Sequence, residues 1–143
     1  MPKSTDTCNR LLRLAFNGTA WPGIADNAAT SPLTGLWLGL YSADPGLGNS
    51  QLTNEVAYSN YARIQIARTT AGWQVTANTA TNVALAQFPQ CGAVGALAKF
   101  AAIGTSATGA GAVLYQGPLN SDLAISNLIQ PQFSAAGLQV TEV

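Results

Sequence analysis

Short stretches that alternate apolar and polar residues, separated by turn residues, most constrain the fold of this chain. Leu36–Ser42 carries a leucine at every second position, and Asp44-Pro45-Gly46 then forms a turn, because Pro fixes φ and Gly accepts positive φ. Similar stretches follow at Tyr61–Thr69, Trp73–Ala77, Thr81–Phe88, Leu97–Ile103, Ala112–Gln116, Leu123–Ile129 and Leu138–Val143. Seven to nine short strands predict an all-β fold, a jelly-roll-like β-sandwich.

Alternation also predicts which way side chains point in these strands. In Tyr61–Thr69 it directs Ala62, Ile64 and Ile66 inward, and Arg63 and Gln65 outward. The strand Leu36–Ser42 has large apolar groups on both faces, since Trp37 and Tyr41 lie opposite the leucines. Such a strand needs cover on both sides.

One helix is predicted before the strands, at about residues 6–17. Its apolar stripe consists of Cys8, Leu11, Leu12, Ala15 and Phe16. Ser4 or Thr5 is suited to cap its beginning and Gly18 to follow its end, while Asp6 and Arg10 stand four residues apart in the favourable order. The stripe either packs on its own domain or docks on a neighbouring subunit.

Size and charge limit the possible functions. With 143 residues, the chain is expected to form one domain over residues 1–143, with a core of its own. Only 8% of the residues are charged and the net charge is zero, so a surface of this kind associates readily with copies of itself. Six basic residues spread along the chain do not predict a nucleic-acid partner.

The sequence favours no enzyme and no cofactor. It has no histidine, which is the usual base of acyl-transfer triads. Lys99 has no serine near it in sequence with which to form a Ser-Lys catalytic pair. Asp44 and Glu55 bracket one loop, but the simpler interpretation is a turn residue and an ion pair with a base such as Arg63. The candidate ligands for calcium are the side-chain oxygen atoms of Asp44, Asn49, Ser50 and Gln51. Only Asp44 is a carboxylate, whereas a calcium site generally uses several, so the sequence predicts no metal site.

The compartment is predicted from the cysteines and the apolar runs. Cys8 and Cys91 have apolar or uncharged neighbours, which favours buried free thiols over a disulfide. The longest weakly polar run, Ala93–Gly104, is too short to cross a bilayer, and no signal peptide is recognised. We therefore expect a soluble protein, made in the host cytoplasm, with no membrane partner.

Three aromatic residues offer an alternative of another class. Trp37, Tyr58 and Tyr61 would suit a sugar-binding face. The competing interpretation is that these rings fill the core or an oligomer contact.

The order of several short motifs resembles a family of small tailed-bacteriophage virion proteins, which comprises capsid cement or decoration proteins and tail or tail-fibre proteins. The motifs are Leu36–Arg63, Leu11-Leu12 with Phe16-Asn17-Gly18, Ala112–Leu119, and Pro131-Gln132-Phe133 followed by Ala136–Thr141. The region Cys91–Ser106 departs from the family, since it is Ala-rich where relatives carry aromatic residues. The resemblance implies a virion structural protein that works as a homo-oligomer, of jelly-roll type in the cement examples.

From the sequence we therefore predict a cement or decoration protein on the capsid surface, with the major capsid protein and copies of itself as partners. The alternatives are a phage tail or tail-fibre component and a carbohydrate-binding module. The residues predicted to make inter-subunit contacts are Leu11, Leu12, Phe16, Trp37, Tyr41, Asp44, Tyr58, Tyr61 and Arg63.

Overall fold

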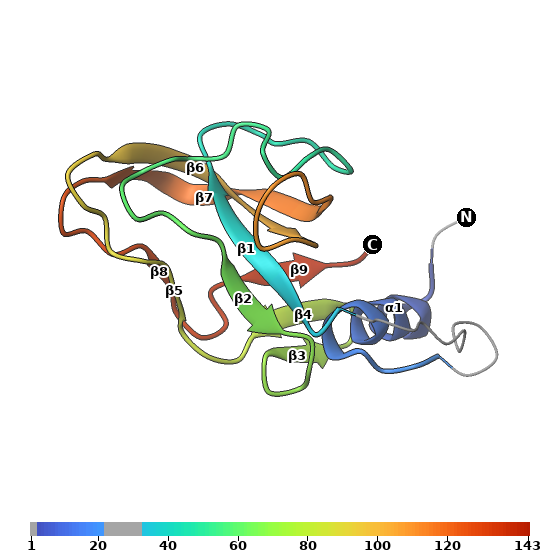
Figure 1. The fold of residues 1–143 in the computed structure, drawn as a ribbon. Helices are drawn as coiled ribbons and strands as arrows, with labels where there is room; N and C mark the ends of the chain where they lie inside the picture. The colour runs from blue at the N-terminus through green and yellow to red at the C-terminus, as the bar shows by residue number, and fades with distance from the viewer. Residues whose placement is uncertain (1–2, 22–32) are drawn as a thin grey trace. The chain divides into compact units, whose positions relative to one another are not determined.

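The computed structural model describes residues 3–21 and 33–143. They form one helix and nine strands, drawn in Figure 1, which confirms an all-β fold with a single helix. The elements are α1 Thr5–Asn17, β1 Gly35–Tyr41, β2 Ile64–Ala67, β3 Trp73–Thr76, β4 Thr79–Asn82, β5 Ala86–Gln87, β6 Ala96–Gly104, β7 Val113–Ile125, β8 Gln132–Phe133 and β9 Gln139–Thr141.

The strands form three sheets, and the chain divides into two compact units. The sheets have the strand orders β2-β1-β6-β7, β3-β4-β9 and β5-β8. The first unit comprises Met1–Gly35, Ile66–Ala86 and Phe133–Val143, and the second comprises Leu36–Gln65 and Gln87–Gln132. Each unit is thus built from segments that are distant in the sequence. The expected single domain and the jelly-roll connectivity stay predictions.

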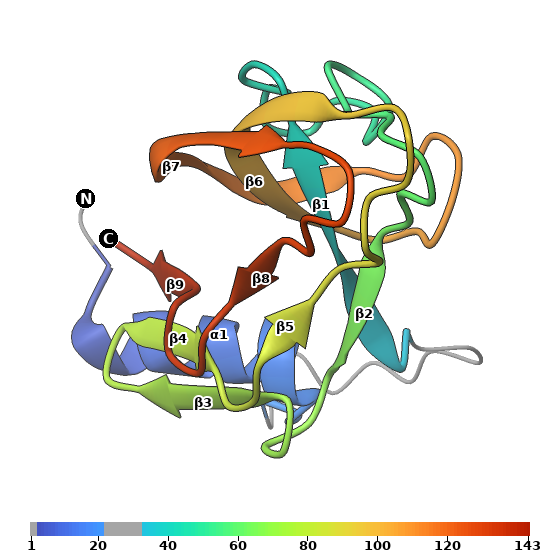
Figure 2. The ribbon, with the colours of Figure 1, turned by 90° about the vertical axis from the view of Figure 1, so that its left-hand side faces the viewer.

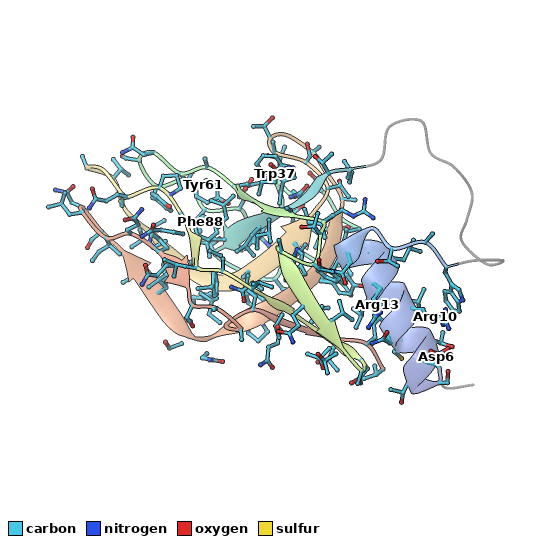
Figure 3. All side chains as sticks on the ribbon, turned by 90° about the horizontal axis from the view of Figure 1, so that it is seen from below. Asp6, Arg10, Arg13, Trp37, Tyr61 and Phe88 are labelled. Atoms are coloured by element: carbon cyan, nitrogen blue, oxygen red, sulfur yellow. The ribbon has the colours of Figure 1, made fainter. Side chains whose placement is uncertain are left out.

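Helix α1, in the first unit, has the ends predicted for it. The Ser4 side chain accepts a hydrogen bond from the Thr7 amide, and Gly18 has φ 63, the left-handed conformation that ends many helices. Asp6 and Arg10 form an ion pair of 2.9 Å one turn apart. In Figure 3 the side chains of Asp6, Arg10 and Arg13 follow one another along the helix.

The helix packs on the small sheet β3-β4-β9, where Figure 2 shows α1 against β3 and β4. Phe16 and Trp73 are both fully buried, and their rings meet edge to face with centroids 4.6 Å apart. Asn17 donates a hydrogen bond of 2.9 Å to the Trp73 carbonyl. The apolar stripe of the helix therefore belongs to the core of its own unit, the first of the two alternatives.

A basic side chain holds the C-terminal end of this helix. Arg68 donates hydrogen bonds of 2.7 Å to the Ala15 carbonyl and 2.8 Å to the Leu14 carbonyl. The last carbonyls of a helix have no partner within it, and a cation there also interacts favourably with the helix dipole. Arg68 follows β2 in sequence and thus joins a distant segment to the end of α1.

Asn82 organises the turns around β4. Its side chain is buried, and its amide nitrogen donates to the carbonyls of Ala84 and Ser134, each at 2.8 Å. Its amide oxygen accepts from the Leu138 amide at 2.9 Å. One side chain thus joins the turn after β4 to two positions, Ser134 and Leu138, that lie more than fifty residues further along the chain.

In the second unit, β1 is covered on both faces. It pairs antiparallel with β6, from Trp37 opposite Gly104 to Tyr41 opposite Phe100. All its side chains are buried apart from the half-buried Trp37. The cover that the sequence required comes from this chain itself.

Strand β7 is longer than the sequence indicated and irregular. It runs through Gly117-Pro118, beyond the predicted end at Gln116, and its pairing with β6 shifts where Lys99 separates Ala98 from Phe100. A bulge of this kind bends a strand and lets it continue past a proline. The curvature of β6 and β7 is visible in Figure 2.

Two predicted strands are shorter in the structure. Thr81–Phe88 is divided into β4 and β5, which leaves Val83 and Leu85 exposed between them. The second, Leu123–Ile129, ends at Ile125 and continues as a turn. In both cases apolar residues in a connection imitate the pattern of a strand.

Cys8 and Cys91 are free and buried, as predicted. Among the described residues, no helix combines the length and the apolar character that crossing a bilayer demands.

Candidate interaction surfaces

The second unit contains a buried ion pair between Arg63 and Glu55. Arg63 Nε and one terminal nitrogen donate to the two carboxylate oxygens at 2.7 Å, a bidentate arrangement. The other donors of the guanidinium reach the carbonyls of Ser106 and Gly109, both at 3.0 Å. The Arg63 side chain is 3% exposed and that of Glu55 12%, so the pair supports structure and offers no charge to a partner.

The outward orientation predicted for Arg63 is therefore wrong, as is the inward one for Ala62, which is exposed. Regular alternation begins only at Ile64, where β2 starts. A guanidinium that finds a carboxylate and two carbonyls is able to lie in the interior, and sequence periodicity does not detect such partners. The predicted pairing of Glu55 with Arg63 is confirmed.

Tyrosines surround this ion pair. The Tyr61 hydroxyl donates to Glu55 at 2.8 Å and accepts from the Leu40 amide at 3.1 Å. Burial raises the pKa of Tyr61 far above its ordinary value and that of Tyr41 to about 12. The Tyr41 hydroxyl lies buried beside the Gln51 side chain, a contact that acts on its pKa in the opposite sense to burial. All these tyrosines therefore stay neutral at ordinary pH.

The loop around Asp44–Thr53 is held from several sides. Asp44 accepts a hydrogen bond from the Gly46 amide at 2.7 Å, as a turn residue does. Gln51 lies fully buried, and its side-chain oxygen accepts from the Ser106 amide at 2.9 Å. Backbone hydrogen bonds join Gly48 to Val113 and Gln51 to Gly111. The structure therefore fixes this loop to residues 105–113.

The predicted contact residues divide into two groups. Interior positions are occupied by Leu12, Phe16, Tyr41, Tyr58 and Arg63. Leu11, Trp37 and Tyr61 are half-buried, and Asp44 is exposed. The first group is covered by the chain itself, because strong apolar character marks core positions as readily as contact positions. A contact role for the second group stays a prediction.

The aromatic residues do not form an exposed sugar-binding face. Tyr58 is buried and donates to the Pro89 carbonyl at 2.8 Å. Its ring meets that of Tyr61 edge to face at 5.2 Å, and Tyr61 in turn stacks with Phe88 at 6.2 Å (Figure 3). These rings fill the interior of the second unit, which is the interpretation that competed with sugar binding.

Within residues 3–21 and 33–143, most charged side chains form ion pairs with one another. The ion pairs are Lys3–Glu142, Asp6–Arg10, Glu55–Arg63 and Lys99–Asp122. Between Arg68 and Glu142 the sequence contains no charged residue except Lys99 and Asp122, which pair with each other at 3.3 Å. The surface contributed by this half of the chain therefore carries almost no net field.

Three residues with exposed apolar side chains are hydrogen-bonded to Cys91 through their backbones, and we call Val94, Leu128 and Ile129 the turn patch. Their exposed fractions are 63%, 69% and 42%. Buried Cys91 connects them: its amide donates to the Ile129 carbonyl, its carbonyl accepts from the Leu128 amide, and its thiol donates to the Val94 carbonyl. The apolar pattern of Leu123–Ile129 predicts a strand and so does not reveal this patch. The Ser126-Asn127 pair was the available turn signal.

Leu128 also has an unusual backbone conformation. Its φ is 68, and it is the third residue of a turn closed by the Ile129 amide and the Ser126 carbonyl at 2.9 Å. That position favours glycine or asparagine, and the left-handed conformation costs an ordinary side chain about 1–2 kcal/mol. A leucine here is both strained and 69% exposed, so neither its backbone nor its burial explains its presence.

The described residues contain no cluster of three or more His, Cys, Asp or Glu side chains arranged to hold a metal ion. Of the four calcium candidates, Asp44 binds its own turn and Gln51 the Ser106 amide.

The comparison with known families decides which kind of protein this is. The profile of the family described as podophage GP4 fiber I protein gp80 matches residues 2–141. The chain belongs to this family. The predicted membership of the phage virion structural proteins is thereby confirmed, and with it a place in the virion. No curated protein matches the chain.

Within this class the family favours the fibre alternative over the cement protein that was the first choice from the sequence. The motifs that carried the resemblance are shared by cement and tail-fibre proteins, so they identified the class and not the place in the particle. The family match extends over nearly the whole chain and includes the Ala-rich region 91–106.

Proposed function

We propose that this protein is a fibre component of a phage virion, that it works as a homo-oligomer, and that it has no enzymatic activity. The observation that carries the proposal is the match of residues 2–141 to a fibre-protein family. The internal pairing of charges supports self-association, since copies with neutral surfaces do not repel one another.

Particle fractionation tests the position in the virion. Phage particles are separated into DNA-filled heads without tails and into tail and fibre fractions, and the protein is quantified in each. A fibre component stays with the tail and fibre fractions at a copy number far below that of the shell protein. Recovery with tailless heads, at a copy number comparable to the shell protein, would favour the cement role.

The absence of catalysis is tested on the two carboxylates that were considered as a pair. Asp44→Ala and Glu55→Ala are expected to change stability or assembly, because these groups serve a turn and a buried ion pair. A reproducible hydrolytic or transfer activity that either change abolishes would contradict a purely structural role.

A further inference from the structure

We infer that the turn patch, Val94, Leu128 and Ile129, is a contact surface for the same patch on a second copy of this chain. The inference rests on the proposed self-association and adds the surface by which it occurs.

The backbone conformation and the exposure of Leu128 support this contact. A turn position that favours glycine or asparagine instead holds Leu128, at φ 68 and 69% exposed. Strain and exposure both oppose this residue in the isolated chain, and an apolar contact removes the cost of exposure. Such outliers collect at places where surrounding function maintains them.

Hydrogen bonds hold the backbone that carries the turn patch. Cys91 hydrogen-bonds to Leu128 and Ile129 through its backbone and to Val94 through its thiol. The Val94 amide donates a hydrogen bond to Ser59 Oγ at 2.9 Å, and the Gln90 side chain donates to the Leu128 carbonyl at 2.9 Å. The three side chains are therefore presented on a fixed backbone, so little order is lost when they bind.

The lack of charged residues near the turn patch in the sequence indicates which partner binds it. Residues 69–98 and 123–141 contain no charged side chain, so neither segment of the patch brings a charge near it in sequence. A charged partner would lose hydration against this surface without receiving a counter-charge. The same patch on a second copy is equally uncharged and apolar, and a two-fold contact needs a surface that complements itself.

Addition of a strand from a second copy to the edge of β7 is a less suitable way to self-associate. Strand β7 contains Pro118, an irregular register with β6, and Asp122, which pairs with Lys99 of β6, and such features disfavour strand addition. The turn patch has none of them.

The test uses opposite charges at one position. Leu128→Lys and Leu128→Asp are each expected to weaken self-association at least about tenfold by analytical ultracentrifugation, because each places two like charges in one two-fold contact. An equal mixture of the two variants is expected to restore association. The matched control is Leu85→Asp, which changes a 52% exposed leucine of the other unit and should leave association unchanged.

A second variant separates contact from folding. Leu128→Asn retains a residue that accepts φ 68 and removes the apolar contact, so it should weaken association while the melting temperature, measured on dilute monomers, is unchanged or raised. A monomeric wild-type protein would overturn both this inference and the proposed self-association. An oligomer that Leu128→Lys and Leu128→Asp leave intact, or that the mixture fails to restore, would overturn the turn-patch contact alone.

Discussion

The two compact units differ in how many signals from near neighbours in the sequence accompany their long-range contacts. The first unit uses a helix with a serine cap, a left-handed glycine and an i to i+4 ion pair, all within about fifteen residues of sequence. The second unit depends on Arg63, whose partners are Glu55, Ser106 and Gly109. Local signals are readable in a sequence, whereas a buried arginine is understood only when its distant partners are known. The second unit is therefore where sequence reasoning failed on side-chain orientation.

Breaking the buried ion pair has the largest expected effect. Arg63→Met should lower the free energy of unfolding by about 3–5 kcal/mol, because it leaves the Glu55 carboxylate buried without its partner. Urea unfolding measures the change. The double variant Arg63→Met with Glu55→Leu should be less destabilised than Arg63→Met alone, since no charge then remains in the interior. Arg10→Met, in an exposed pair, is the control and should cost no more than about 0.5 kcal/mol.

The corresponding long-range contact of the first unit is Asn82. Asn82→Ala should lower the free energy of unfolding by about 2–3 kcal/mol, because the Leu138 amide and two carbonyls lose their partner. The same denaturation experiment measures it, with exposed Asn120→Ala as the control. A loss below about 0.5 kcal/mol would mean that water replaces this side chain freely.

Two tyrosines in the second unit separate hydrogen bonding from simple burial. Tyr61→Phe should cost about 1–2 kcal/mol, because the hydroxyl bonds both Glu55 and the Leu40 amide. Tyr41→Phe should cost less than Tyr61→Phe, since the buried Tyr41 hydroxyl makes a weak contact with the Gln51 side chain. Thermal unfolding of the two variants compares them. Equal losses would show that ring packing, and not the hydroxyl, determines both values.

The smallest expected effect is at the start of the helix. Ser4→Ala should cost about 1 kcal/mol, because the Thr7 amide then has no side-chain acceptor. Ser4→Asp should retain most of the stability, since its carboxylate is also a good cap and favours the positive end of the helix dipole. A loss of equal size in both variants would exclude capping as the cause.

The sequence predicted what depends on near neighbours. Helix α1 with its caps and the strands β1, β3 and β6 follow from periodicity, and the structure has them within two residues. The sequence did not separate Val83 or Leu128, which lie in connections, from strand residues, because exposed apolar side chains look the same in both settings. Nor did it identify Asn82 and Gln51 as interior residues, because their partners Ser134, Leu138 and Ser106 lie 52 to 56 residues away.

The interleaved segments of the first unit have a consequence for synthesis. Its sheet is completed by β9, Gln139–Thr141, which pairs with β4, and Glu142 pairs with Lys3. These residues are synthesised after β3 and β4, so β4 lacks its β9 neighbour until they have left the ribosome. We therefore expect that a chain without residues 134–143 assembles poorly and is degraded readily. An affinity tag joined directly to Val143 should slow the pairing of β9 with β4, and a flexible linker before the tag should restore it.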